Sequence, residues 1–108
     1  MNKVVLSGRI SKDIFMYNKE RHFAIMTIAV AKNYNKEETD FIPILIGGTQ
    51  AKDLNKRYFK GDLVCIQASV TTFMKDGKQT LGLAGEVIEY LAPGQIHKAL
   101  NEKKKNEG

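Results

Sequence analysis

The segment from residue 39 to residue 68 constrains the fold most, because its hydrophobic period changes twice. An apolar run at residues 41–46 stops at Gly47-Gly48, and apolar residues then recur at helical spacing. These helical positions are Ala51, Leu54 and Tyr58. From residue 63 apolar side chains occupy every second position again, which is the period of a strand. The segment therefore predicts a strand, one short helix and a second strand.

The expected helix has a start signal and a stop signal. Thr49 offers a side-chain hydroxyl for the N-cap, and Gly61 can take the left-handed conformation that ends a helix. One short helix between the third and fourth strands is typical of a five-stranded OB-fold barrel. We therefore expect an all-β fold of this class, an architecture that binds oligonucleotides or oligosaccharides.

The expected strands are short apolar runs bounded by turn residues, and they cover residues 4–10, 23–32, 41–46, 63–75 and 80–91. In the first strand, Gly8 indicates a bulge or a tight bend at a barrel corner. Residues 16–21 are polar and basic, which predicts a loop or hairpin.

The second strand is apolar on both sides, so two layers must cover it. Our interpretation is that a second subunit covers the outer side; loops or the C-terminal segment are the alternative.

Asp76-Gly77 is a strong signal for a two-residue hairpin loop, because both central residues need positive φ. The loop predicts four pairs between the flanking strands: Thr72–Leu81, Val70–Leu83, Phe73–Thr80 and Lys75–Lys78. The inner face of the fourth strand is then Val64, Ile66, Ala68, Val70, Thr72 and Met74. Its outer face is Gln67, Ser69, Thr71, Phe73 and Lys75.

Length and composition fit one cytoplasmic domain. The chain has 108 residues, a hydrophobic share of 43% and a net charge of +5, which is compatible with a polyanionic partner. We expect residues 1–92 to form the domain and residues 93–108 to form a short basic tail, partly helical or disordered. No membrane span or signal peptide is expected. Cys65 is the only cysteine, so no intrachain disulfide is expected.

The sequence assembles no catalytic or metal site, and we expect no enzymatic activity, metal or cofactor. His22 and His97 stand apart from any cluster of metal-ligating residues. Gly47-Gly48-Thr49 lacks the lysine and the spacing of a phosphate-binding loop. The carboxylates are scattered among lysines, as on a solvated surface.

Aromatic and basic residues predicted on the outer surface support the functional hypothesis. The aromatic residues are Tyr34, Phe41 and Phe73, and the basic residues are Arg9, Lys32, Lys75 and Lys78. Bases of a flexible single strand stack on such rings at about 1–3 kcal/mol each, while cations bind its phosphates. Every base has a stacking face, so this surface would bind with little sequence preference. The alternative is that loops cap Tyr34 and Phe41, and that Phe73 only decorates a hairpin.

Four segments in order resemble the bacterial and phage single-stranded DNA-binding protein (SSB) family: MNKVVLSGRISKD, TIAVAKNY, TDFIPILIGGTQAKDLNKRYFKGD and EVIEYL. The resemblance covers about residues 1–91. It implies an OB fold and a homo-oligomer, usually a tetramer. It also implies sequence-independent coating and protection of single-stranded DNA during replication, recombination or repair, at the nucleoid.

The resemblance assigns DNA contacts to particular side chains. Tyr34 and Phe41 fall on the family's stacking aromatics, after the second strand and at the start of the third. The family's DNA-facing strand positions are occupied here by Arg9, Lys32, Thr71 and Phe73, with basic residues frequent in the family at the last two. Lys75 and Lys78 complete the candidate DNA-binding set.

The sequence departs from the family at several positions. Many members carry another stacking aromatic where Gly47 stands, and a basic or polar residue where Pro43 stands. Tryptophan is absent, so stacking would fall to Phe and Tyr. The chain ends in a basic run that includes Lys103, Lys104 and Lys105, whereas cellular members end in an acidic tip that recruits replication and repair enzymes. This ending is typical of a phage or mobile-element form or of a truncated chain, and recruitment through an acidic tip is not expected.

Two other functions remain open at this point. One is a primosome-type accessory OB protein, a dimer that acts mainly through protein partners such as a helicase. The other is a small nuclease or nucleotide hydrolase, for which the sequence provides no assembled site.

Overall fold

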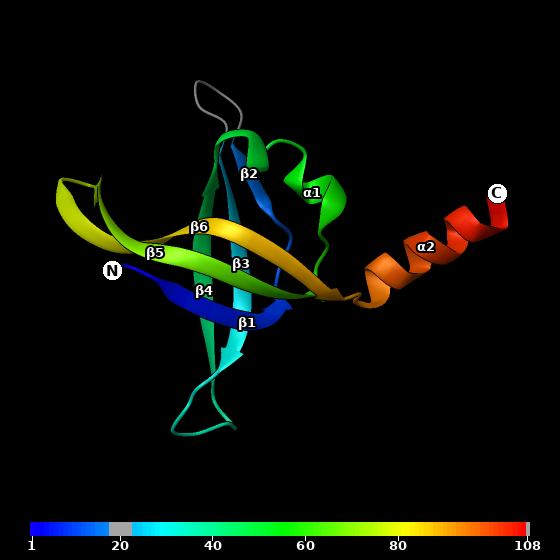
Figure 1. Ribbon diagram of the computed structural model, residues 1–108, viewed down its shortest axis with the longest axis horizontal. Coiled ribbons are helices and arrows are strands. Elements are labelled where there is room, and N and C mark those ends of the chain that lie inside the picture. Colours follow the sequence, from blue (N-terminus) through cyan, green and yellow to red (C-terminus); the bar gives the residue numbers. More distant parts are fainter. Residues whose placement is uncertain (18–22, 108) are drawn as a thin grey trace.

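The computed structural model describes residues 1–17 and 23–107 (Figure 1). In chain order its elements are β1 (Val4–Ile10), β2 (Phe15–Tyr17), β3 (Phe23–Ala31), β4 (Thr39–Gly47), the 3-10 helix η1 (Gly48–Gln50), α1 (Leu54–Arg57), β5 (Leu63–Lys75), β6 (Lys78–Ala92) and α2 (Gln95–Glu107). Among these described residues, no helix is long and apolar enough to cross a membrane.

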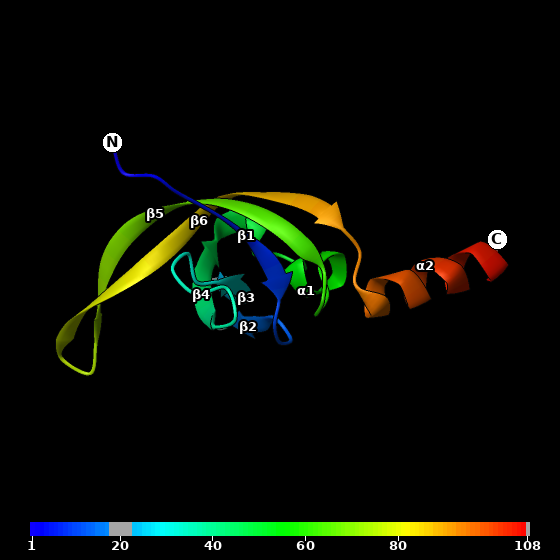
Figure 2. The same ribbon diagram turned by 90° about the horizontal axis from the view of Figure 1, so that it is seen from below.

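Five of the strands pair in a ring. β1 pairs with β5, β5 with β6, β6 with β4 and β4 with β3, and β1 also pairs with β3. Two of these seams are short: β4 and β6 share the pair Leu45↔Ala84, and β1 meets β3 at two consecutive pairs that begin with Arg9↔Ala29. Figure 2 shows β5 and β6 arching over β3 and β4. The all-β, OB-type class expected from the sequence is confirmed, with narrow closing seams.

The core is the inward face of these strands together with anchors from the β4–β5 connection. Its largest fully buried apolar side chains are Ile10, Met26, Ile28, Ile44, Ile46, Leu54, Val64 and Ile66. Burial of one such side chain stabilises the fold by about 1.5–3 kcal/mol, so this cluster is a main source of folding free energy. The inward positions predicted for the first half of β5, at Val64, Ile66 and Ala68, are confirmed.

The seam between β1 and β3 depends on a glycine. A Cβ atom at Gly8 would lie 2.2 Å from the carbonyl oxygen of Ala29, which is far closer than two such atoms can approach. The two backbones therefore come together because position 8 has no side chain. Pairing between β1 and β5 continues unbroken through Gly8↔Val64, so this position is a barrel corner and not a bulge.

The β5–β6 hairpin is confirmed in its turn and in its register. Asp76 and Gly77 both have positive φ, at 51° and 75°. The four predicted pairs are all present: Thr72↔Leu81, Val70↔Leu83, Phe73↔Thr80 and Lys75↔Lys78. One turn signal and the alternation of the flanking residues were enough to specify this register.

The inner face predicted for the second half of β5 is wrong for the isolated chain. Val70, Thr72 and Met74 are exposed, although they continue the row of buried residues that starts at Val64. The reason is that the hairpin extends past the end of the barrel, as Figure 1 shows, and has no second layer there. Alternation fixes which side a residue takes, but not whether anything covers that side.

The helix predicted to begin at Thr49 is also wrong in its extent. Thr49 lies inside η1, neither helix has a side-chain cap, and α1 begins only at Leu54, after Asp53 in the left-handed region at φ 57°. Ala51 and Leu54 are nevertheless buried, as their spacing predicted. Two buried anchors and bonds to the barrel, such as the one from Gln50 Nε2 to the carbonyl of Glu86 (2.6 Å), therefore outweigh helix continuity.

Part of the segment predicted as loop or hairpin is a strand. Met16 and Tyr17 belong to β2, which pairs with β3 through Phe15↔Ile25, Met16↔Ala24 and Tyr17↔Phe23. Residues 18–21, the rest of that prediction, lie outside the described residues. β2 adds a sixth described strand beside the ring.

A buried carboxylate joins the last helix to the barrel. Asp62 is fully buried, and its oxygens accept hydrogen bonds from the backbone N–H of Phe59 (2.9 Å) and Gly94 (2.8 Å) and from Nδ1 of His97 (2.9 Å). The Asp62 charge and burial together raise the pKa of Tyr90, with burial the larger cause. His97, which looked isolated in the sequence, thus fixes the first turn of α2 to the start of β5.

Replacement of Asp62 by Ala should destabilise the fold by about 3 kcal/mol, because three buried or half-buried donors lose a charged acceptor. Urea denaturation monitored by circular dichroism measures this loss. The exposed Asp13→Ala variant is the matched control and should stay within about 0.5 kcal/mol of the parent. Equal stability of the two variants would contradict the structural role of Asp62.

Candidate nucleic-acid interface

The outward face of β2, β3 and β4 is mostly apolar and aromatic, with Thr27 buried in its middle. Directly paired residues point to the same side of a sheet, so the register assigns whole rows to this face. The rows are Phe41–Ala29–Arg9, Pro43–Thr27, Leu45–Ile25–Phe15 and Gly47–Phe23–Tyr17. Phe41 and Phe15 have 65% and 55% of their surfaces exposed. None of these side chains carries a negative charge.

This face continues onto the β5–β6 hairpin. The pair Leu45↔Ala84 joins the outward sides of β4 and β6, and Ala84 is paired in turn with Ser69 of β5. Further along the hairpin, the same side carries the predicted residues Thr71, Phe73, Lys75 and Lys78, all of them exposed. The register therefore places Phe41 and Phe73 on one connected outer surface.

The Phe73 ring lies against the backbone of the neighbouring strand. A Cβ atom at Gly82 would come within 2.6 Å of Cε1 of Phe73, so the ring occupies the space that a side chain there would need. The ring keeps 44% of its surface exposed. Gly82 thus orients Phe73 with one side on the sheet and leaves the other side for a ligand.

Lys32 and Tyr34 form a small polar cluster at the base of the β3–β4 loop. The Lys32 ammonium lies 5.7 Å from the centroid of the Tyr34 ring, whose side chain is 82% exposed. Lys32 also makes a short ion pair with Asp40. The hydrogen bond with Asp40 is the main cause that raises the pKa of Lys32, so the lysine stays charged. Its charge is partly countered by the carboxylate beside it.

Arg9 belongs to the outer face by register, but its guanidinium is directed along one edge. Nη1 of Arg9 donates to the carbonyl oxygen of Gly61 at 2.8 Å. There it lines a hollow of about 520 Å³ at the base of α2, together with Lys60 and Lys98 and without an acidic residue. The structure therefore places Arg9 apart from the Lys32–Tyr34 cluster and from the hairpin lysines.

Pro43 does not interrupt the pairing of β4 with β3. It is paired with Thr27 of β3, and β6 meets β4 only further along, at Leu45. The missing N–H of proline therefore falls where β4 is locally an edge strand.

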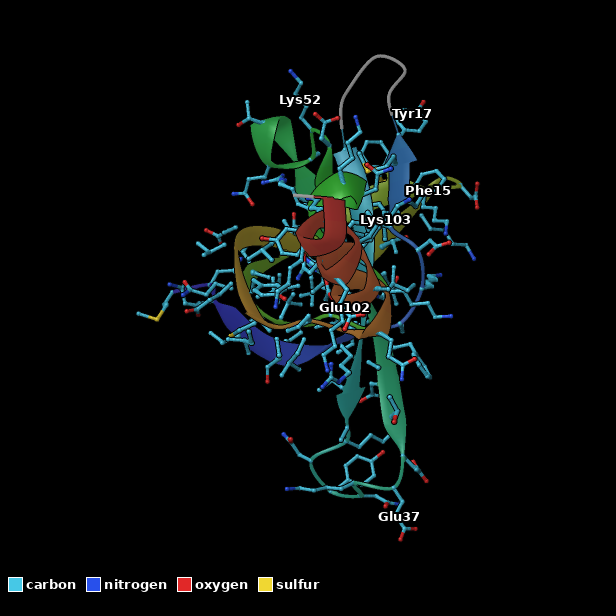
Figure 3. All side chains as sticks on the ribbon, turned by 90° about the vertical axis from the view of Figure 1, so that its right-hand side faces the viewer. Phe15, Tyr17, Glu37, Lys52, Glu102 and Lys103 are labelled. Carbon is cyan, nitrogen blue, oxygen red and sulfur yellow. The ribbon has the colours of Figure 1, made fainter. Side chains whose placement is uncertain are left out.

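Three aromatic residues on the outward face were not among the DNA-binding residues that the sequence suggested. Phe15, Tyr17 and Phe23 lie on β2 and β3, and the rings of Tyr17 and Phe23 are stacked with centroids 4.6 Å apart. Figure 3 shows Phe15 and Tyr17 along the same edge of the molecule. The available signal was the alternation of Phe15 and Tyr17, which a three-residue strand makes too short to recognise. No group of metal-ligating residues occurs within the part of the chain that the structure describes.

Comparison with known proteins identifies the family. The sequence profile of the Single-strand binding protein family matches residues 1–92. The chain belongs to this family. The resemblance seen in the sequence is thereby confirmed.

Curated relatives carry the same description. Single-stranded DNA-binding protein 3 of Clostridium acetobutylicum is 38% identical over an alignment of 84 positions, and the alignment covers 72% of this chain and 58% of the relative. The Single-stranded DNA-binding protein of Malacoplasma penetrans is 33% identical over an alignment of 98 positions, and the alignment covers 86% of this chain and 51% of the relative. The chain thus spans between half and three fifths of the length of these relatives.

Solved structures share the fold. Crystal structures of the mitochondrial single-stranded DNA-binding protein Rim1 of S. cerevisiae include one that superposes with a TM-score of 0.71 at 22% identity, covering 87% of this chain and 97% of Rim1. A second Rim1 structure gives a TM-score of 0.68 at 21% identity. These similarities support the OB-type fold of the chain.

Proposed function

We propose that this chain binds single-stranded DNA without sequence preference, and that it coats and protects exposed strands during replication, recombination or repair without catalysing a reaction. The observation that carries the proposal is the connected outer surface on which Phe41 and Phe73 are both exposed. Membership of the family supports it. An accessory role through protein partners is not favoured, since the curated relatives are named for DNA binding.

The surface suits a flexible polyanion for a physical reason. Aromatic rings with one free side accept unpaired bases of any identity, and stacking contributes about 1–3 kcal/mol per base. In a duplex the bases are stacked and paired inside the helix, so they are not available to stack on these rings. Lys32, Lys75 and Lys78 lie near Tyr34 and Phe73 and supply the complementary charge.

We propose that the functional unit is a homo-oligomer, and specifically a tetramer. The exposed apolar side of the hairpin supports self-association, because Val70, Met74 and Leu81 share that side, which is opposite to Phe73. A second copy packed there would complete the inner row of β5, which the isolated chain leaves exposed. We place the site of action at the DNA of the cytoplasm or nucleoid.

Binding should be strong for oligo(dT), much weaker for a matched duplex, and reduced by salt as counterions are released. Fluorescence anisotropy with labelled oligonucleotides across a salt series measures all three. Phe41→Ala and Phe73→Ala should each weaken oligo(dT) binding by about five- to a hundredfold, the loss of one stacked base. Equal affinity for single strand and duplex would contradict the proposed function. Full oligo(dT) binding by both variants would refute the proposal that Phe41 and Phe73 form a stacking surface.

The Asp40→Asn variant should bind oligo(dT) more tightly, by up to about fivefold at low salt, because it releases Lys32 from its ion pair. The slope of log affinity against log salt should steepen by about 0.7, the value for one more phosphate contact on a single strand. Asp53→Asn is the matched control, since the Asp53 carboxylate pairs with Lys56 in the exposed β4–β5 connection. An unchanged affinity and slope in Asp40→Asn would show that Lys32 makes no phosphate contact.

A further inference from the structure

We propose that the aromatic residues of β2 and β3 form a second base-stacking station on the DNA path. The station consists of Phe15 and the stacked pair Tyr17–Phe23. It takes bases of the same single strand that stacks on Phe41. The proposal rests on the proposed function and extends it to residues outside the set that the sequence suggested.

The station is part of the surface that carries Phe41. Leu45 lies four residues beyond Phe41 on β4, and its row crosses the sheet through Ile25 to Phe15. Strand geometry puts this row about 13 Å from Phe41 along β4, and Phe15 about 10 Å further across the sheet. Pro43 and Leu45 form an uncharged floor between them. A strand that leaves Phe41 can therefore reach Phe15 over apolar surface.

The neighbouring row has an open place beside a ring. Gly47 is paired with Phe23, and a Cβ atom at Gly47 would meet nothing within 4 Å. No described side chain therefore fills the space next to Phe23 on the β4 side. The Tyr17 and Phe23 rings are nearly parallel, at 22°. A planar base placed over Gly47 can extend this stack, which is the geometry that aromatic rings prefer.

The chemistry of the face favours bases as the occupant. Phe15 exposes 55% of its surface, and the rows of this face contain no carboxylate that would repel a phosphate. The face also continues directly into the proposed DNA surface at Phe41. Bases are therefore the occupant to which we commit, and a second copy of the chain is the outcome that would contradict it.

A tryptophan reporter tests the station directly, because the chain has no tryptophan of its own. In the Phe15→Trp variant, oligo(dT) should quench the single tryptophan as bases stack on it, as it should in Phe41→Trp. Phe15→Ala and Tyr17→Ala should each weaken oligo(dT) binding by about five- to a hundredfold, while Tyr17→Phe keeps the ring and should bind like the parent.

Controls separate this inference from the proposed function. Leu100→Ala removes a partly exposed apolar side chain on α2, outside this face, and should bind normally. Thermal melts by circular dichroism confirm that each variant is folded. If Tyr17→Ala unfolds, the variants of the exposed Phe15 decide the test.

The outcomes distinguish the two proposals. Suppose that the parent binds oligo(dT) and Phe41→Ala does not, while the Phe15 variants bind fully and Phe15→Trp is not quenched. The station is then refuted and the proposed function stands. A change of mass in light scattering with unchanged DNA binding would instead make this face a contact between copies. A parent that does not bind oligo(dT) would overturn both proposals.

Discussion

The closure of five strands into a ring is the constraint on which the rest of this structure depends. Closure occurs through two short seams, one between β1 and β3 and one between β4 and β6. The first needs the bare backbone of Gly8 against the carbonyl of Ala29, since any side chain would hold the strands apart. Once the ring is closed, alternate residues of each strand face a dry interior and the others face outward.

The outward side is then free to carry function. The β4–β6 seam matters here for a second reason, because Leu45↔Ala84 links the outer surface of the barrel to that of the hairpin. Glycines shape this surface: Gly82 leaves room for the Phe73 ring, and Gly47 leaves the space beside Phe23 open. Binding of a flexible strand needs such flat, partly exposed rings at intervals, together with cations between them.

Asp62 links the barrel to α2, a helix that takes no part in the strand pairing of the ring. Two of its three hydrogen bonds hold Gly94 and His97, and so set the direction in which α2 leaves the barrel (Figure 1). The Arg9, Lys60 and Lys98 side chains gather around the same point. A buried acid among these groups keeps a basic helix close to a basic edge, where repulsion alone would favour separation.

The sequence by itself determined where the five main strands lie along the chain, the inward residues in the first half of β5 and the register of the hairpin. Those features follow from local rules: alternation, and the positive φ that Asp76-Gly77 favours. Other features depend on contacts between distant segments. The break before α1 reflects the anchoring of Ala51 and Leu54 in the core, and β2 exists only because β3 pairs with it. Sequence alternation also could not show that Val70 and Met74 lie beyond the barrel, or that Phe15, Tyr17 and Phe23 share a face with Phe41. Only the tertiary structure decided these points. Whether a residue is covered, and which residues lie beside it on the surface, depends on how the strands close into the ring and not on any one strand.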